Sequence, residues 1–366
     1  MGQLLSHPVE EKELDYKSHT KMTYCVGSMQ GYRMSMEDAH SVKINEDETV
    51  AVFGVFDGHG GKQCSEYLRE HLAKHIFKHL LSEKDKASRH HSRRQCDNKH
   101  IIALLKHAFF KTDHDLSHYS NFINCGSTGI ILCVVNNKLY VANTGDSRCI
   151  LSTQNGCAKP LSFDQKPNLM GERVRIENSN GYVVNNRINE ILALSRAFGD
   201  FKFKIPFLKS TNNEYIIQNI KMEKTNPHHF LESGSSLEQT RAETHEYVQI
   251  PPELFQVTVE PDILIYDMNE VGEPEFVVMA CDGIWDCFKN SQLVKLIRDK
   301  LVLGWRLNKI VEYILNDSLT MANNYTGIGF DNMTLIILAL HSDGDIDKWY
   351  EKMITKIERE KGLRTW

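Results

Sequence analysis

The sequence predicts an α+β fold in which sheets are covered by helices. Strand-like runs follow one another with only turn residues between them at 129–152. Amphipathic segments at 62–81 and 101–116 are typical of helices, but they do not alternate strictly with strands. Adjacent strands interspersed with helices favour α+β over a parallel, doubly wound sheet, which is the weaker alternative.

Length and composition are those of an intracellular globular protein. The 366 residues are 41% hydrophobic and 25% charged, enough for one large domain or two modest ones. A net charge of -5 gives no electrostatic case for binding nucleic acid. Nine cysteines without a C-x-x-C pair occur in apolar runs, for example around Cys133 and Cys281. They indicate reduced thiols and a cytoplasmic location, with the nucleus as the alternative.

The N-terminal segment, residues 1–22, is expected to be flexible. It has no secretory leader, and no run approaches the ~18 apolar residues of a membrane span. Gly2 and Ser6 fit the M-G-x-x-x-[ST] pattern of N-myristoylation, although a chance match in a disordered start is the alternative. A single myristoyl chain predicts weak, reversible membrane contact.

Further elements follow in order along the chain. A short β-branched run at 49–56 predicts a buried strand that ends at the glycine-rich DGHGG loop, and the helix at 62–81 begins after it. Residues 82–100 are charged and aperiodic, which indicates a solvated loop rather than a metal site. The polar stretch at 204–256 indicates an insertion or flap.

Regular structure is predicted again towards the C-terminus. The expected elements are strands at 275–280 and 334–340, a helix from 290 to about 303, and a helix in the tail, 341–366.

Acidic residues adjoin three of the predicted strands. Asp57 and Asp282 each follow a strand and precede a glycine, and Asp331 lies just before the last strand. An Asp-Gly pair alone is more often a turn than a ligand site. If these residues converge with Glu37 and Asp38, the buried like charges require dications, and oxygen ligands favour Mg²⁺ or Mn²⁺ over zinc.

Seven sequence blocks stand out between about residues 23 and 340. The blocks are MQGYRMSMEDAH (29–40), VFDGHGG (55–61), CGSTG (125–129), VANTGDSR (141–148), ILALSRAFGD (191–200), CDGIWD (281–286) and DNMT (331–334). In these blocks and in their order the chain resembles the protein phosphatase 2C family of metal-dependent serine/threonine phosphatases. The overall look, from MGQLLSHP through QGYRMSMEDAH, is similar to fungal members.

The resemblance implies a catalytic domain at 23–340 built as two antiparallel sheets, packed as a sandwich and flanked by helices. It implies two Mg²⁺ or Mn²⁺ ions, with Asp57 bridging them and the Gly58 carbonyl bound to one. Asp282 and Asp331 would hold the other ion, and Glu37 and Asp38 would lie around the pair. Asp146 and Asp286 match positions associated with a weaker third metal.

The resemblance also implies the reaction, which is hydrolysis of phosphoserine and phosphothreonine in protein substrates by a water activated between two metals. Arg33 would hold the phosphate, because its planar fork matches two phosphate oxygens. His59 would protonate the leaving oxygen. The alternative is a loop histidine that contacts the metal ligands and takes no part in the reaction. We expect a monomer.

The chain departs from the family pattern at Gln165, where histidine is common, and at Ile188-Asn189-Glu190, where Val-Asn-Gly is common. Neither departure replaces a proposed ligand. A non-catalytic binding protein on the same fold would be expected to lose a metal aspartate or the phosphate arginine, and all are present. A metal-dependent nuclease is disfavoured because no basic face with interleaved aromatics is evident.

Overall fold

The computed structural model describes residues 4–89, 97–119, 122, 124–204, 251–269, 274–341 and 344–362. Gly2 and most of the 204–256 stretch lie outside these residues, so the expectations for them stay predictions. Within the described ranges, no helix combines the length and the apolar character that crossing a bilayer requires.

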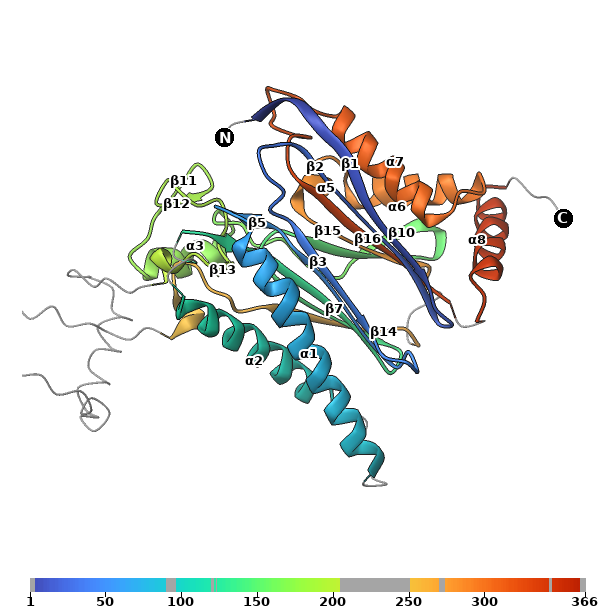
Figure 1. Cartoon of the computed structure of the whole chain (residues 1–366), viewed down its shortest axis with the longest axis horizontal. Helices are drawn as coiled ribbons and strands as arrows, with labels where there is room; N and C mark the ends of the chain where they lie inside the picture. Colours follow the sequence, from blue (N-terminus) through green and yellow to red (C-terminus); the bar gives the residue numbers. More distant parts are fainter. Residues whose placement is uncertain are drawn as a thin grey trace, which may run out of the picture.

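Two antiparallel sheets form the centre of the molecule (Figure 1). The six strands of the first sheet, in spatial order, are β1 (Leu4–Ser18), β2 (Met22–Arg33), β16 (Met333–Leu340), β15 (Phe276–Ala280), β9 (Arg148–Thr153) and β10 (Cys157–Pro160). The five strands of the second are β14 (Asp262–Asp267), β8 (Lys138–Thr144), β7 (Gly129–Val135), β4 (Val50–Phe56) and β3 (Ala39–Ile44).

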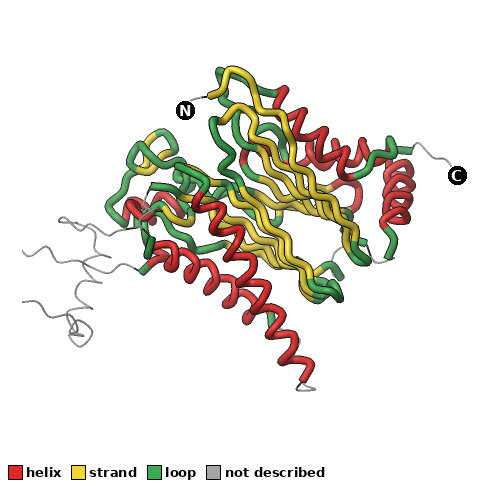
Figure 2. Tube along the Cα trace, viewed as in Figure 1, coloured by secondary structure: helices red, strands yellow, loops and turns green. Residues whose placement is uncertain are grey.

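Helices cover the outer face of each sheet, so the order of layers is helix, sheet, sheet, helix (Figure 2). The second sheet carries α1 (Gln63–Arg89) and α2 (Asn98–Ser117), and the first carries α5 (Asp282–Trp285), α6 (Asn290–Val302), α7 (Leu307–Thr320) and α8 (Ile346–Glu360). The expected α+β sandwich is confirmed, and the parallel alternative is wrong because the pairings within both sheets are antiparallel.

Strand β4 shows why the strands look uniformly apolar in the sequence. Val50, Val52 and Phe56 pack towards the helices α1 and α2, whereas Ala51 and Phe53 pack between the two sheets. Successive side chains of a strand point to opposite faces, and both faces are covered here. A continuous apolar run therefore marks a strand in the interior of four layers.

Smaller elements complete one end of the sandwich. A short sheet contains β5 (Gly58–His59), β6 (Gly126–Ser127) and β13 (Phe198–Gly199), with β6 in the middle. Beside it lie α3 (Met170–Asn178) and the hairpin of β11 (Val183–Val184) and β12 (Arg187–Ile188).

Two local expectations were wrong. Residues 4–18 form strand β1 instead of a flexible segment, and α1 continues to Arg89 instead of ending near residue 81. β1 is an edge strand whose side chains are mostly exposed and include a run of charged residues at 10–13, a composition that protects sheet edges and also resembles disorder. Its pairing with β2 is continuous from Lys12 to Ser18 and is interrupted by register shifts nearer its start.

Deleting residues 1–18 is expected to lower the free energy of unfolding by at least about 3 kcal/mol. The deletion removes several β1–β2 backbone hydrogen bonds, each worth about 0.5–1.5 kcal/mol, and exposes the edge of β2. Urea unfolding of the full chain and of the shortened chain, followed by circular dichroism, measures the difference. An unchanged midpoint and slope would contradict the assignment of this segment to the sheet.

Candidate metal centre

A cleft of about 430 Å³ opens at the end of the sandwich where the predicted site residues meet. Its lining includes Arg33, Glu37, Asp57, Gly58, His59, Asp146, Asp282 and Asp331. They come from the ends of β2, β4 and β15, the start of β16, strand β5, the β2–β3 loop and the β8–β9 turn. Because these strands end on the same side of the sandwich, residues up to 298 positions apart in sequence become neighbours.

Two glycines permit the backbone segments of the site to approach each other. A Cβ on Gly58 would lie 2.8 Å from the Ser65 Oγ and closer still to the Glu37 carbonyl oxygen. A Cβ on Gly283 would overlap the carbonyl group of Asn332, directly after Asp331. Glycine at these positions thus brings the DGHGG loop against Glu37 and the start of α5 against Asp331.

The carboxylates at the centre of the cleft repel each other. Burial, reinforced by the charges of Asp282 and Asp38, raises the pKa of Asp57 well above its ordinary value. Burial and the charges of Asp146 and Asp331 likewise raise the pKa of Asp282. Several desolvated like charges favour bound dications as counter-charge, so this donor set fits oxygen-seeking metal ions such as Mg²⁺ or Mn²⁺.

Asp38 adjoins this group from beneath the cleft surface. Burial raises its pKa to about 7, and its Oδ2 is buried without a hydrogen-bond partner among the described residues. One ligand atom each from Asp38, Asp57 and Cys281 lies within 4.8 Å of the others. Cys281 was not predicted from the sequence to be part of this group. Burial raises the pKa of its thiol well above the usual range, and its Sγ accepts a hydrogen bond of 3.1 Å from the Thr334 amide, so this neutral thiol supports the site rather than ligating a metal.

Glu37 lines the cleft with both carboxylate oxygens already engaged. Ser35 donates to one at 2.8 Å, and the Gly61 amide donates to the other at 3.0 Å. The side chain of Asn332 holds the same loop, accepting from the Glu37 amide at 2.9 Å and donating to the Ser35 carbonyl at 3.1 Å. Glu37 is thus fixed beside the aspartates, and Asn332 is a supporting residue that the sequence analysis did not identify.

Arg33 reaches into the cleft and donates from Nη2 to Oδ2 of Asp331. Burial works against its charge, but Asp331, Asp282 and Asp57 outweigh this effect and raise the pKa of the guanidinium. Its Nε is buried without a hydrogen-bond partner among the described residues. The Arg33 guanidinium is permanently charged and has unused donors beside Asp331, so it is suited to bind an anionic group of a substrate.

Asp146 and Asp286 occupy different positions relative to the cleft. Asp146 lines it, and burial raises the pKa of Asp146 to about 6, partly offset by Lys166 at 3.6 Å. Asp286 is exposed and does not belong to the described cleft lining. Gln165, the departure from the family pattern, braces the turn before Asp146, because its Oε1 accepts from the Gly145 amide at 2.8 Å.

His59 lines the cleft with its side chain 29% exposed, and its Nε2 lies 2.6 Å from Oδ2 of Asp200. Burial favours the neutral ring, but the Asp200 carboxylate outweighs this effect and raises the pKa of His59. Asp200 was not predicted from the sequence as a site residue, although it is the last residue of the ILALSRAFGD block.

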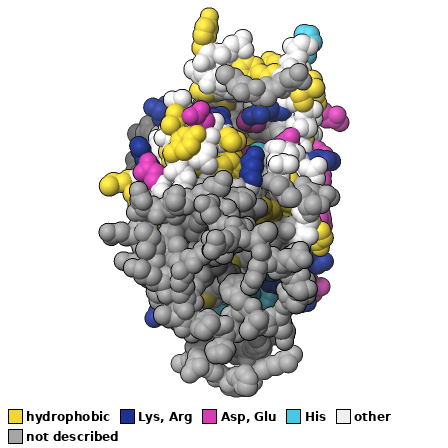
Figure 3. Space-filling model, turned by 90° about the vertical axis from the view of Figure 1, so that its left-hand side faces the viewer, with side chains coloured by type: hydrophobic (Ala, Val, Ile, Leu, Met, Phe, Trp, Pro, Cys, Tyr) yellow, Lys and Arg dark blue, Asp and Glu magenta, His cyan; other side chains and the backbone are white. Residues whose placement is uncertain are grey.

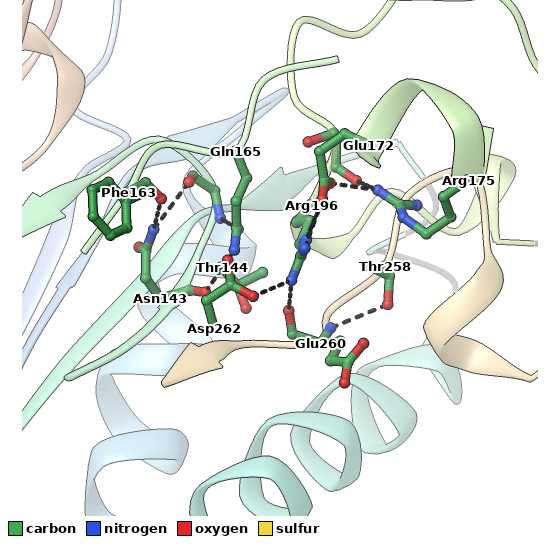
Figure 4. Close-up of polar contacts among 12 residues, drawn as sticks. Asn143, Thr144, Phe163, Gln165, Glu172, Arg175, Arg196, Thr258, Glu260 and Asp262 are labelled. Atoms are coloured by element: carbon green, nitrogen blue, oxygen red, sulfur yellow. Dashed lines mark hydrogen bonds and ion pairs between the residues drawn. The ribbon is translucent and has the colours of Figure 1, made fainter. Parts of the chain in front are cut away.

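One wall of the cleft comes from the β12 region, which contributes Arg187, Leu192 and Leu194. A buried ion-pair network anchors this wall to the body (Figure 4). Arg196 Nη2 lies 2.6 Å from Glu172 Oε1, and its Nη1 donates to the Glu260 carbonyl oxygen at 2.9 Å. Arg175 approaches the second oxygen of Glu172 at 2.7 Å. The wall is therefore held by charge as well as by a small apolar core.

The end of the molecule that carries this wall has a mixed surface. Hydrophobic, basic and acidic side chains are interspersed on the described part of the face in Figure 3. A nucleic-acid groove would need a continuous basic surface there. The described part of this face therefore gives no support to the nuclease alternative.

These features define a class of protein, a four-layer sandwich with a carboxylate-rich cleft suited to metal ions at one end. The family model described as Protein phosphatase 2C matches residues 22–326. Protein phosphatase 2C homolog 4 of Saccharomyces cerevisiae is 37% identical, with 99% of this chain and 100% of the relative covered. Protein phosphatase 2C homolog 3 of Schizosaccharomyces pombe is 34% identical, covering 99% of this chain and 75% of the relative.

The chain belongs to the protein phosphatase 2C family. The fold also matches a solved serine-threonine phosphatase 2C of Toxoplasma gondii, with a TM-score of 0.65, 16% identity, and coverage of 90% of this chain and 99% of that one. A second phosphatase structure from Toxoplasma gondii matches with a TM-score of 0.64 and 21% identity over 91% of this chain and 96% of that one. The expected family and its similarity to fungal members are confirmed.

Proposed function

We infer that this chain is a metal-dependent protein serine/threonine phosphatase that hydrolyses phosphoserine and phosphothreonine in protein substrates. The observation that carries this is the convergence of Asp57, Asp282 and Asp331 with Arg33 in one cleft. An acidic centre fits dications, and the adjoining guanidinium fits a phosphate group. Family membership supports the same activity.

We propose that the cleft holds two Mg²⁺ or Mn²⁺ ions. Asp57 and the Gly58 carbonyl, with Asp282 and Asp331, supply the oxygen ligands, and Glu37 and Asp38 lie around them. When bound, two such ions supply a water that is deprotonated near neutral pH and charge that stabilises the transferring phosphoryl group. A weaker third ion at Asp146 and Asp286 would compete with Lys166 for Asp146.

The remaining steps belong to side chains of the chain itself. Arg33 has five donors in a planar fork and orients the phosphate by two parallel hydrogen bonds. His59 holds a proton at the cleft wall, where it can be given to the leaving seryl or threonyl oxygen. The chain thus needs no nucleophilic side chain, because water is the nucleophile.

Phosphate release from a phosphothreonine peptide tests this function. We expect turnover with Mn²⁺ or Mg²⁺, none with EDTA, and recovery when excess metal is restored. Duplex DNA serves as the comparison substrate and should stay intact under the same conditions. A folded protein that releases no phosphate with either metal, or that cleaves DNA instead, would refute the proposal.

A further inference from the structure

The carboxylate of Asp200 lies behind the imidazole of His59 as seen from the cleft. The Asp200 side chain is only 3% exposed and is not part of the described cleft lining, whereas His59 is. Their contact of 2.6 Å joins Asp200 Oδ2 to Nε2 of the ring. Nδ1 is therefore the ring nitrogen that this contact leaves available to a substrate.

The short three-stranded sheet sets up this contact through its register. Gly126 in the central strand β6 pairs with His59 of β5 on one side and with Gly199 of β13 on the other. Asp200 follows Gly199 directly. The acid and the histidine therefore approach each other across a single residue of the central strand, on rigid backbone that is suited to hold a functional pair.

Gly126 keeps open the space in which the two side chains meet. A Cβ at this position would lie 2.6 Å from His59 Nε2 and closer still to Asp200 Oδ2. Real Cβ atoms do not approach polar atoms so closely, so any other residue here would push the pair apart. The absence of a side chain at Gly126 is thus a requirement of the contact.

Asp200 itself has a left-handed backbone conformation, with φ of 51°. Most residues with a side chain avoid this region, although aspartate tolerates it better than most. Its amide donates to the Cys125 carbonyl at 3.0 Å, and its carbonyl accepts from the Phe203 amide at 2.9 Å. The surrounding hydrogen bonds maintain the conformation that directs the carboxylate to the ring.

A buried ion pair stabilises the loop on both sides of Asp200. Lys204 Nζ lies 2.8 Å from each carboxylate oxygen of Asp113 on α2. One of these oxygens also accepts from the Gly199 amide at 2.9 Å. Gly199 and Lys204, on either side of Asp200, are therefore both bound to Asp113 of α2. The loop between them has little freedom to move Asp200 away from His59.

We propose that Asp200 is the positioning residue of the general acid. It accepts a hydrogen bond from Nε2 of His59 and so fixes both the ring orientation and the nitrogen that faces the substrate. As water attacks phosphorus, the bond from phosphorus to the seryl or threonyl oxygen breaks and that oxygen takes the proton from Nδ1. The ring becomes neutral and keeps its proton on Nε2, which still donates a hydrogen bond to Asp200. This inference rests on the acid role of His59 in the proposed function.

Two substrates with different leaving groups separate positioning from a general structural effect. A phosphothreonine peptide needs its leaving oxygen protonated, whereas p-nitrophenyl phosphate releases a stable phenolate without help. We expect Asp200→Asn to lower kcat on the peptide by about 10- to 100-fold, within the range that general acid catalysis supplies. On p-nitrophenyl phosphate kcat should change less than about 3-fold, with KM unchanged for both substrates.

Two further variants complete the test: a double variant of His59 and Asp200, and a change at Gly126 that separates the two side chains. Asp200→Asn should add no further loss on the peptide when His59→Gln is already present, because both changes remove one function. Gly126→Ala should reproduce the substrate difference without altering either side chain. Asp115→Asn, on the exposed part of α2, is the matched control and should leave both substrates unaffected. Thermal unfolding confirms that each variant is folded.

The outcomes distinguish the acid role of His59 from the positioning role of Asp200. If His59→Gln slows both substrates equally, the acid role in the proposed function is wrong. If His59→Gln is selective for the peptide but folded Asp200→Asn and Gly126→Ala are not, the acid role stands and the positioning role of Asp200 is refuted. Additive losses in the double variant would refute it as well.

Discussion

Replacing Asp282 with asparagine is expected to lower kcat/KM on a phosphothreonine peptide by about 10²- to 10³-fold or more. Asparagine keeps the shape of the side chain but loses the charge that a dication needs, and several kcal/mol of transition-state stabilisation correspond to such factors. Initial rates over a range of Mn²⁺ concentrations measure both the loss and any shift in the metal concentration required.

Although the same substitution lowers activity, it is expected to leave the stability of the metal-free protein unchanged or to increase it. Burial and neighbouring carboxyls raise the pKa of Asp282, which shows that its charge is unfavourable there without metal. In EDTA the variant should therefore unfold at the same temperature as the wild type or higher, and added Mn²⁺ should raise its Tm less. Asp299→Asn, at an exposed position of α6 paired with Lys361, should behave as wild type. A variant that is less stable in EDTA and retains the full metal effect would mean that Asp282 is structural.

The core of the site could be predicted because its residues adjoin strands that the sequence shows clearly. Asp57, Asp282 and Asp331 each border an apolar run, and the structure places all three in one cleft. Their convergence did not follow from spacing, since the antiparallel sandwich brings together strand ends that are distant in sequence. The family resemblance supplied that step.

Supporting residues were harder to predict, because their roles depend on contacts between distant segments. Asp200 and His59 are 141 positions apart and meet only through the register of β5, β6 and β13. Asn332 links its own loop to Glu37, 295 positions away. Gln165 departs from the family pattern yet holds the turn before Asp146. No local pattern reveals such partners, although Asp200 lies inside a block already recognised.

The elements of the fold were predictable where burial dictates the pattern and less so at the surface. The strand now called β4 and the helix α1 begin within two residues of the predicted positions. The polar edge strand β1 has no apolar run, because its backbone pairing with β2 is what orders it. Side-chain pattern carries little information about a strand of this kind.

Glu172→Gln is expected to reduce the free energy of unfolding by about 3 kcal/mol at neutral pH. Burial would raise the pKa of Glu172, but hydrogen bonds and charge from Arg196 and Arg175 outweigh it and lower the pKa to about 2. Relative to the ordinary value of 4.5, that difference corresponds to about 3 kcal/mol held by the ionised form. Glutamine resembles the protonated acid and leaves two guanidinium groups facing an uncharged partner (Figure 4).

The pH dependence of stability gives the same quantity independently. Because the folded-state pKa is lowered, the stabilisation by Glu172 is complete above about pH 4.5 and is lost as the pH falls towards 2. Urea unfolding between pH 7 and pH 3 should show that the free energies of unfolding of the variant and the wild type approach each other as the pH is lowered. Glu177→Gln, on the exposed face of the same helix and paired with Arg173, should cost less than about 0.5 kcal/mol at any pH. A difference between variant and wild type that stays constant with pH would show that packing, and not the charge of Glu172, holds α3 and the cleft wall in place.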